Sequence, residues 1–285
     1  MIAARRVRHP LIMGKPPELA PEILEYYLGG GEDTRLRSGR GRLELWRTQD
    51  VLRRLLPPPP ARVLDVGGGT GVHAEWLAAD GYAVDLVDPV PAHVERASGL
   101  PGVTAALGDA RALDAADATA DAVLLLGPLY HLPDRADRVR ALAEARRAVR
   151  PGGVVAAATI SRWAAVHDLV RKGAYADEAV RRVADDVAGD GLLRSHPGSG
   201  FTTAYFHHPD ETLGEFADAG LPGARRYALE GVFAWYEALD TWLDDPERRT
   251  ALLNAARRAE GDPTLLGATG HMITAALAPR ETLTS

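Results

Sequence analysis

From Ala61 onward the chain alternates short apolar segments with helical segments, and this alternation limits its fold more than any other feature. Five apolar segments have the length of β-strands, at 62–66, 83–87, 103–107, 121–126 and 154–160. Helical patterns occupy about 72–79, 91–98 and 134–149. Short apolar strands that alternate with helices are typical of a parallel sheet with helices on both faces. The sequence therefore predicts a doubly wound α/β fold.

The alternation is interrupted twice. Residues 161–200 are polar and helical and too long for a plain connection, and residues 232–266 are rich in Trp, Asp and Arg. A helix at 209–219 and strands near 224–230 and 269–278 complete the α/β pattern. Insertions into such a sheet usually border its ligand-binding edge, so we predict lid insertions at about 161–200 and 232–266.

Composition narrows the function. The chain has 285 residues, no cysteine and a net charge of −6. Thiolate catalysis, thiolate metal sites and disulfides are thereby excluded, and the charge argues against nucleic acid as a partner. No apolar run approaches the roughly 20 residues needed to span a bilayer, and none of secretory length follows the basic N-terminus. We expect a cytoplasmic protein that does not bind membranes.

The strongest local motif is Val63-Leu64-Asp65-Val66-Gly67-Gly68-Gly69-Thr70-Gly71, in which a strand enters a glycine turn and then a helix. Glycines permit positive φ and let a ligand lie against the backbone. An ordinary strand–helix turn would look similar, and Gly69, Gly71 and Ala74 also satisfy a nicotinamide-type pattern. The motif predicts a ligand-binding turn. The class of ligand has to be inferred from the residues around the motif.

Acids at the ends of three successive strands separate these alternatives. Asp65 precedes the glycines, where a carboxylate suits the ammonium group of a zwitterionic ligand and not a pyrophosphate. Asp88 is placed to bind two ribose hydroxyls, and Asp109 to bind the amino group of adenine. Taken singly, Asp88 with Pro89 could be a helix cap, and Gly108-Asp109 a turn. Together the three acids suit a nucleoside that carries an amino-acid tail.

Over about 61–160 the chain resembles the class I S-adenosylmethionine-dependent methyltransferases. The resemblance includes Gly127-Pro128-Leu129-Tyr130-His131-Leu132 and the turn Val149-Arg150-Pro151-Gly152-Gly153. It implies seven strands in the order 3-2-1-4-5-7-6, with the seventh antiparallel. It also implies an N-terminal arm and helical cap over 1–56 in front of a Rossmann-like domain over 57–285.

The resemblance assigns cofactor-binding roles to individual residues. Asp65, Gly67 and Gly69 would flank the methionine portion of S-adenosylmethionine, with backbone groups of Leu126 and Gly127 near its ammonium. Asp88, with Pro89 beside it, would bind the ribose, and Asp109 with the Ala110 amide would bind the adenine.

The methyl acceptor is expected to be a small molecule that receives the methyl group on an O, N or C atom, and the sequence does not identify that atom. Gly127 stands where nucleobase amino-methyltransferases carry Asn or Asp before Pro-Pro-Tyr, so amine methylation on nucleic acid is disfavoured. Tyr130 and His131 are the candidates nearest the reacting methyl group, with His131 as the base if one is needed. Tyr26, in the cap, and the pair His207 and His208 are candidates for substrate contact.

The histidines show no spacing typical of a metal site, so no metal is predicted. The sequence also leaves two other functions open, an NAD-dependent oxidoreductase and a non-catalytic domain that binds S-adenosylmethionine. The oligomeric state is also open.

Overall fold

The computed structural model describes residues 20–29, 32–195 and 201–280. The predicted arm lies outside these residues up to Leu19, and α1 to α3 follow it. The helices of the described residues are α1 (Pro21–Leu28), α2 (Glu32–Arg37), α3 (Gly41–Leu55), α4 (Val72–Ala79), α5 (Pro91–Ala97), α6 (Arg135–Ala148), α7 (Ala164–Arg171), α8 (Glu178–Asp190), α9 (Pro209–Asp218), α10 (Leu239–Asp244) and α11 (Pro246–Ala259). The strands are β1 (Arg62–Val66), β2 (Ala83–Asp88), β3 (Val103–Leu107), β4 (Ala120–Leu125), β5 (Val149–Ser161), β6 (Leu192–Leu193), β7 (Ala204–His207), β8 (Arg225–Ala228) and β9 (His271–Leu277).

The sheet has the predicted doubly wound topology. Strands β3, β2, β1, β4 and β5 lie side by side and are parallel. Strand β9 pairs antiparallel with β5 from Val154 to Ile160, and β8 pairs antiparallel with β9. These two strands take the places predicted for the seventh and sixth strands, so the order 3-2-1-4-5-7-6 with an antiparallel last strand is confirmed.

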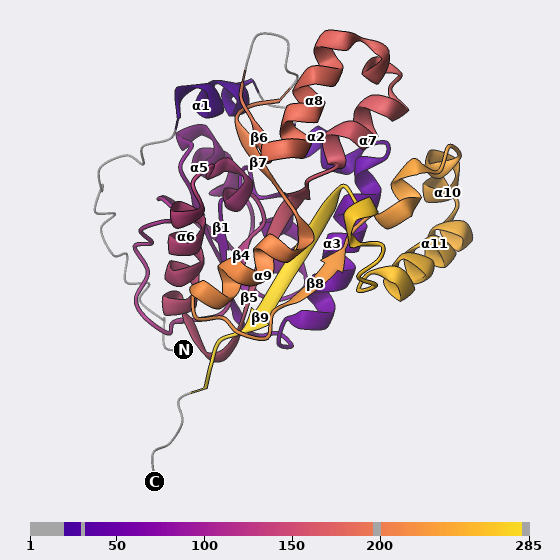
Figure 1. Ribbon diagram of the computed structural model, residues 1–285. Helices are drawn as coiled ribbons and strands as arrows, with labels where there is room; N and C mark the ends of the chain where they lie inside the picture. Colours follow the sequence, from indigo (N-terminus) through magenta and orange to yellow (C-terminus); the bar gives the residue numbers. More distant parts are fainter. Residues whose placement is uncertain (1–19, 30–31, 196–200, 281–285) are drawn as a thin grey trace, which may run out of the picture.

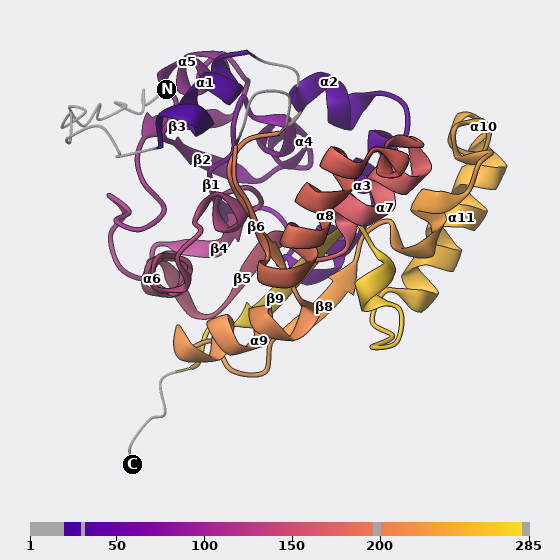
Figure 2. The same ribbon diagram turned by 45° about the horizontal axis from the view of Figure 1, so that its top comes forward.

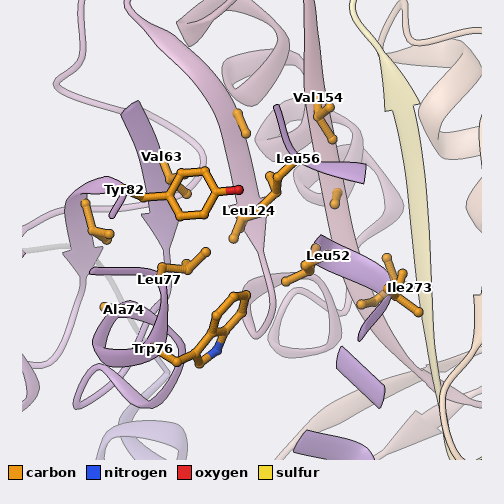
Figure 3. Packing of buried hydrophobic residues seen from close by; sticks show 14 of the residues in the cluster. Leu52, Leu56, Val63, Ala74, Trp76, Leu77, Tyr82, Leu124, Val154 and Ile273 are labelled. Atoms are coloured by element: carbon orange, nitrogen blue, oxygen red, sulfur yellow. The ribbon is translucent and has the colours of Figure 1, made fainter. Parts of the chain in front are cut away.

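Alternate residues of each strand point to opposite faces, and each face has its own apolar cluster. One cluster contains Leu52 from α3 and Leu56 directly after that helix, together with Trp76 and Leu77 from α4, as Figure 3 shows. The other lies under α6 and α9 and includes Leu142 and Phe216. The sheet is thus covered on both sides, and only its edges are left to form a site.

The carboxyl edge of the sheet carries additional elements that the sequence pattern did not predict. The short strand β7 pairs parallel with the last two residues of β5, and β6 pairs antiparallel with β7. Helices α7 and α8 lie near α2 at this edge, and α10 and α11 lie beside β8 (Figures 1 and 2). Helices α7, α8, α10 and α11 belong to the two predicted insertions, whose role as lids stays a prediction. Among the described residues, no helix has both the length and the apolar character needed to cross a bilayer.

Candidate functional site

The glycine turn after β1 has the backbone conformation that glycine permits. Gly67 and Gly69 have φ values of +67° and +58°. A Cβ atom on Gly67 would lie 2.5 Å from Cγ of Pro128, whereas a Cβ atom on Gly69 would meet no described heavy atom within 4 Å. The turn is closed by the loop after β4 on one side and is open at Gly69, where a ligand has room to approach the backbone.

Asp65, beneath this turn, is a fully buried carboxyl group. Neither of its side-chain oxygens has a hydrogen-bond partner among the described residues. Burial, together with the nearby charge of Asp88, raises the pKa of Asp65 to about 7. A buried polar group without a partner is costly, so this carboxyl group is suited to receive a donor or a positive charge from a ligand.

Asp88 ends β2 and ties three segments together. Its Oδ2 accepts a hydrogen bond from the Gly69 amide at 2.9 Å, and its Oδ1 accepts one from the Val90 amide at 2.9 Å. Nδ1 of His93 lies 3.0 Å from the same Oδ1 and donates to it when the carboxyl group is ionised. Pro89 is half-buried beside it, and α5 begins at Pro91. Asp88 therefore braces the glycine turn, and the predicted binding of ribose stays a prediction.

Asp109, after β3, has a partner that the sequence did not reveal. Arg111 donates to both of its oxygens, from Nε to Oδ1 at 3.0 Å and from Nη2 to Oδ2 at 2.6 Å. Burial raises the pKa of Asp109, but the hydrogen bonds and charge of Arg111 outweigh this and lower it overall. Ala110 is half-buried between the two residues. The predicted binding of adenine would have to share the carboxylate with Arg111.

The loop after β4 links the glycine turn to the helical cap. Leu126 and Gly127 lead into a 3-10 helix, Pro128–His131. A Cβ atom on Gly127 would lie 3.2 Å from the carbonyl oxygen of Gly67 and 3.5 Å from Oη of Tyr130. The segment thus lies against the turn, as predicted for a loop at this edge of the sheet.

His131 has contacts on both ring nitrogens. Its Nδ1 lies 3.3 Å from the carbonyl oxygen of Thr203 and donates to it, which leaves Nε2 to accept from the hydroxyl of Tyr27 in α1 at 2.5 Å. Burial lowers the pKa of His131 to about 4. His131 is therefore a neutral imidazole near pH 7, bound to the cap.

A cavity of about 1000 Å³ lies between the carboxyl edge of the sheet and the cap. Tyr130 and Ile160 line it from the sheet side, and Tyr26 from α1. Most of the wall is apolar. Further apolar lining comes from Leu43 of α3, Val183 of α8, Phe206 of β7 and Trp235. The size and character suit a small organic molecule.

One end of this cavity is charged. Glu44, Glu230 and His271 line it, with ligand atoms within 4.8 Å of one another, a spacing at which a metal ion could be held. All three side chains already have protein partners. Arg35 donates to both oxygens of Glu44, and Nδ1 of His271 lies 2.6 Å from Oε1 of Glu230. We interpret the group as an ion-pair network. No pattern in the sequence groups these three residues.

The two histidines predicted to contact substrate, His207 and His208, do not line the cavity. His207 is fully buried with Nε2 at 3.4 Å from Oε2 of Glu215, and His208 is exposed and begins α9 as its N-cap. Each position is explained by a structural contact, and a substrate role for either stays an untested prediction. Tyr26, by contrast, lies on the cavity wall.

The parallel sheet, the glycine turn after β1 and the acid after β2 define a Rossmann-like fold of the class I methyltransferase type. Residues 63–153 match a protein family described as methyltransferase domain. An uncharacterized methyltransferase of Mycobacterium tuberculosis is 42% identical over 101 residues, 35% of this chain and 40% of that protein. A ubiquinone biosynthesis O-methyltransferase of Methylocella silvestris is 37% identical over 126 residues, 41% of this chain and 48% of that protein.

A solved structure of a putative S-adenosylmethionine-dependent methyltransferase from Listeria monocytogenes aligns with a TM-score of 0.57 at 17% identity, over 84% of this chain and 100% of that chain. The structural likeness shows the fold, and the chain spans less than half the length of both curated relatives. Residues 63–153 therefore form a methyltransferase domain, and these likenesses support the predicted class I family and its cofactor, S-adenosylmethionine.

Proposed function

We propose that this protein transfers the methyl group of S-adenosylmethionine to a small molecule bound in the cavity. The observation that carries the proposal is the segment Gly127–Tyr130, which contacts the glycine turn at Gly67 and lines the cavity through Tyr130. A donor on the turn and an acceptor in the cavity would meet at this loop. The named relative from Methylocella silvestris, an O-methyltransferase of ubiquinone biosynthesis, supports a small-molecule acceptor.

The residues of the turn fit the cofactor. The orphaned carboxyl group of Asp65 would receive its ammonium, the open face of Gly69 would admit its methionine portion, and Asp88 would bind its ribose. Leu126 and Gly127 would contribute backbone groups, and Asp109 with Ala110 would bind its adenine. When bound, S-adenosylmethionine supplies a methyl group that is already activated on a sulfonium. The protein has to align the acceptor with it and to exclude water.

Tyr130 and His131 would then act on the acceptor side. Tyr130 borders the cavity and would orient the acceptor through its hydroxyl. With a pKa of about 4, His131 is a weak base in the state described, and its bond to Tyr27 favours a role in closing α1 over the site. A base role for His131 would require acceptor binding to displace Tyr27. Helices α1 to α3, α7 and α8 would serve as the cover that keeps water out.

The Asp88→Ala variant tests the assignment of the turn. We expect a loss of roughly 1–3 kcal/mol in S-adenosylmethionine binding, about 5- to 150-fold in Kd, because hydrogen bonds to the cofactor and the brace on Gly69 are both removed. Isothermal titration calorimetry measures it. Asp85→Ala is the matched control on the same strand, since Asp85 pairs with Arg62 at the surface. Equal affinities of the two variants would remove Asp88 from the site.

A further inference from the structure

The charged group of the cavity, Glu44, Glu230 and His271, lies at the carboxyl edge of the sheet. His271 begins β9 and pairs with Ile160 at the carboxyl end of β5. Glu44 reaches it from α3 and also lies close enough to His73 of α4 for the two to interact electrostatically. Helix α4 is the helix that follows the glycine turn. The charged group therefore connects the cavity to the helix beside the cofactor turn.

The imidazole of His271 is held in one orientation by Glu230. Oε1 of Glu230 lies 2.6 Å from Nδ1 of His271, while Oε2 accepts from the His271 amide at 2.9 Å and from the Thr269 hydroxyl at 3.0 Å. Glu230 is 7% exposed. Because Nδ1 is committed to this carboxylate, Nε2 is the ring nitrogen left for a ligand in the cavity that His271 lines.

The surrounding charges favour the protonated imidazole. Glu230 bonds to His271, and Oε2 of Glu44 lies 3.5 Å from Nδ1. Arg35 of α2 opposes them but is itself bonded to Glu44. Burial lowers the pKa of His271, yet the two carboxylates together raise it to about 9. Near pH 7 this end of the cavity thus presents an N–H donor with a positive charge.

We propose that His271, oriented by Glu230, binds an acidic oxygen of the acceptor through Nε2 and holds it as the oxyanion, so that the acceptor is a phenol, an enol or a carboxylic acid. This inference rests on the proposed methyl transfer and names its substrate class. The acceptor oxygen releases its proton to solvent on binding. An electron pair on this oxygen, or on a carbon conjugated with it, then forms the bond to the methyl group. The electron pair of the broken carbon–sulfur bond stays on sulfur.

An amine acceptor fits this end of the cavity less well. An ammonium group would face the imidazolium of His271, and both carboxylates of the network are already engaged, Glu230 by His271 and Glu44 by Arg35. An oxyanion, in contrast, gains a charge-assisted hydrogen bond. The largely apolar wall beyond would accommodate the hydrocarbon part of such an acid.

Binding of 4-nitrophenol, whose ionised form has its own absorbance, tests the proposal without cofactor. At pH 8 we expect the wild-type protein to bind the phenolate at least tenfold more tightly than the His271→Gln variant. Arg135→Gln, which removes an exposed positive charge outside the cavity, should bind like the wild type. Phenolate affinity should also fall above pH 9, as His271 loses its proton.

Two outcomes would overturn the proposal. One is equal phenolate affinity in the wild type and His271→Gln, and the other is no saturable binding to the wild type. If the glutamine variant does not fold, wild-type affinity that stays constant from pH 8 to pH 10.5 would overturn it as well. Calorimetry with S-adenosylmethionine on the same preparations separates this proposal from the proposed function, because failure to bind cofactor leaves the phenolate result unaffected.

Discussion

The Asp65→Asn variant should be more stable than the wild-type protein at pH 8 and should bind S-adenosylmethionine at least tenfold more weakly. Asp65 is fully buried, and its pKa of about 7 is well above the ordinary value of 3.8. Between about pH 4 and pH 7 the unfolded chain loses the Asp65 proton while the folded chain keeps it. The unfolded state is thereby favoured, and the contribution of Asp65 to stability falls as the pH rises.

Above pH 7 this loss of stability levels off. The difference between a pKa of about 7 and one of 3.8 corresponds to at most ~4 kcal/mol in the free energy of unfolding. Asparagine carries no charge and escapes the loss, but its buried amide also lacks partners, so we expect a gain of ~1–4 kcal/mol at pH 8. At pH 4 the gain should vanish. Urea denaturation at the two pH values measures it, with Asp85→Asn as the control on β2. A variant that is less stable than the wild type at pH 8 would contradict this account of Asp65.

The Arg138→Ala variant should lose ~3–5 kcal/mol of stability, since it leaves a buried carboxylate without its partner. Nε of Arg138 in α6 lies 2.8 Å from Oε1 of Glu215 in α9, and the two side chains are 3% and 1% exposed. Nη1 of Arg138 also donates to the carbonyl oxygens of Leu132 and Pro133, directly after the loop that carries Tyr130. The guanidinium lies 3.8 Å from the ring centroid of Tyr205 in β7.

Arg135→Ala provides the matched control in the same helix. Arg135 pairs with Asp218, and both side chains are more than half exposed. Exposed pairs of this kind contribute little, so we expect a change within about 0.5 kcal/mol. Urea denaturation of both variants gives the comparison. A loss below 1 kcal/mol for Arg138→Ala would show that the buried pair does not hold α6, α9 and the loop together.

The sequence predicted the sheet well because parallel strands leave a strong local signal. Strands buried on both faces, such as β1 and β4, consist mostly of apolar residues, and the glycine turn marks the end of β1. The predicted strand β5 was extended by the structure to Val149, and its neighbour β7 was missed. Only the last two residues of β5 pair with β7, so no periodic pattern reveals it.

The candidate site was predictable only where its residues lie at strand ends. Asp65, Asp88 and the loop to Tyr130 follow β1, β2 and β4, and the topology brings them to one edge. The network of Glu44, Glu230 and His271 has no such signal, because tertiary packing alone joins the cap, the segment after β8 and the start of β9. The sequence indicates only that His271 is a residue of the last strand. Its position in the cavity wall is what suggests a role in binding.

Calorimetric titration of the wild-type protein with S-adenosylmethionine, its demethylated product and NADH tests the central claim most directly. Asp65 beneath the turn, the open approach to Gly69 and the match to a methyltransferase domain predict saturable binding of the first two, with one site per chain. NADH should give no comparable heat, because its pyrophosphate would lie over the buried acid of Asp65. Binding of NADH without binding of S-adenosylmethionine would contradict the account and favour an oxidoreductase.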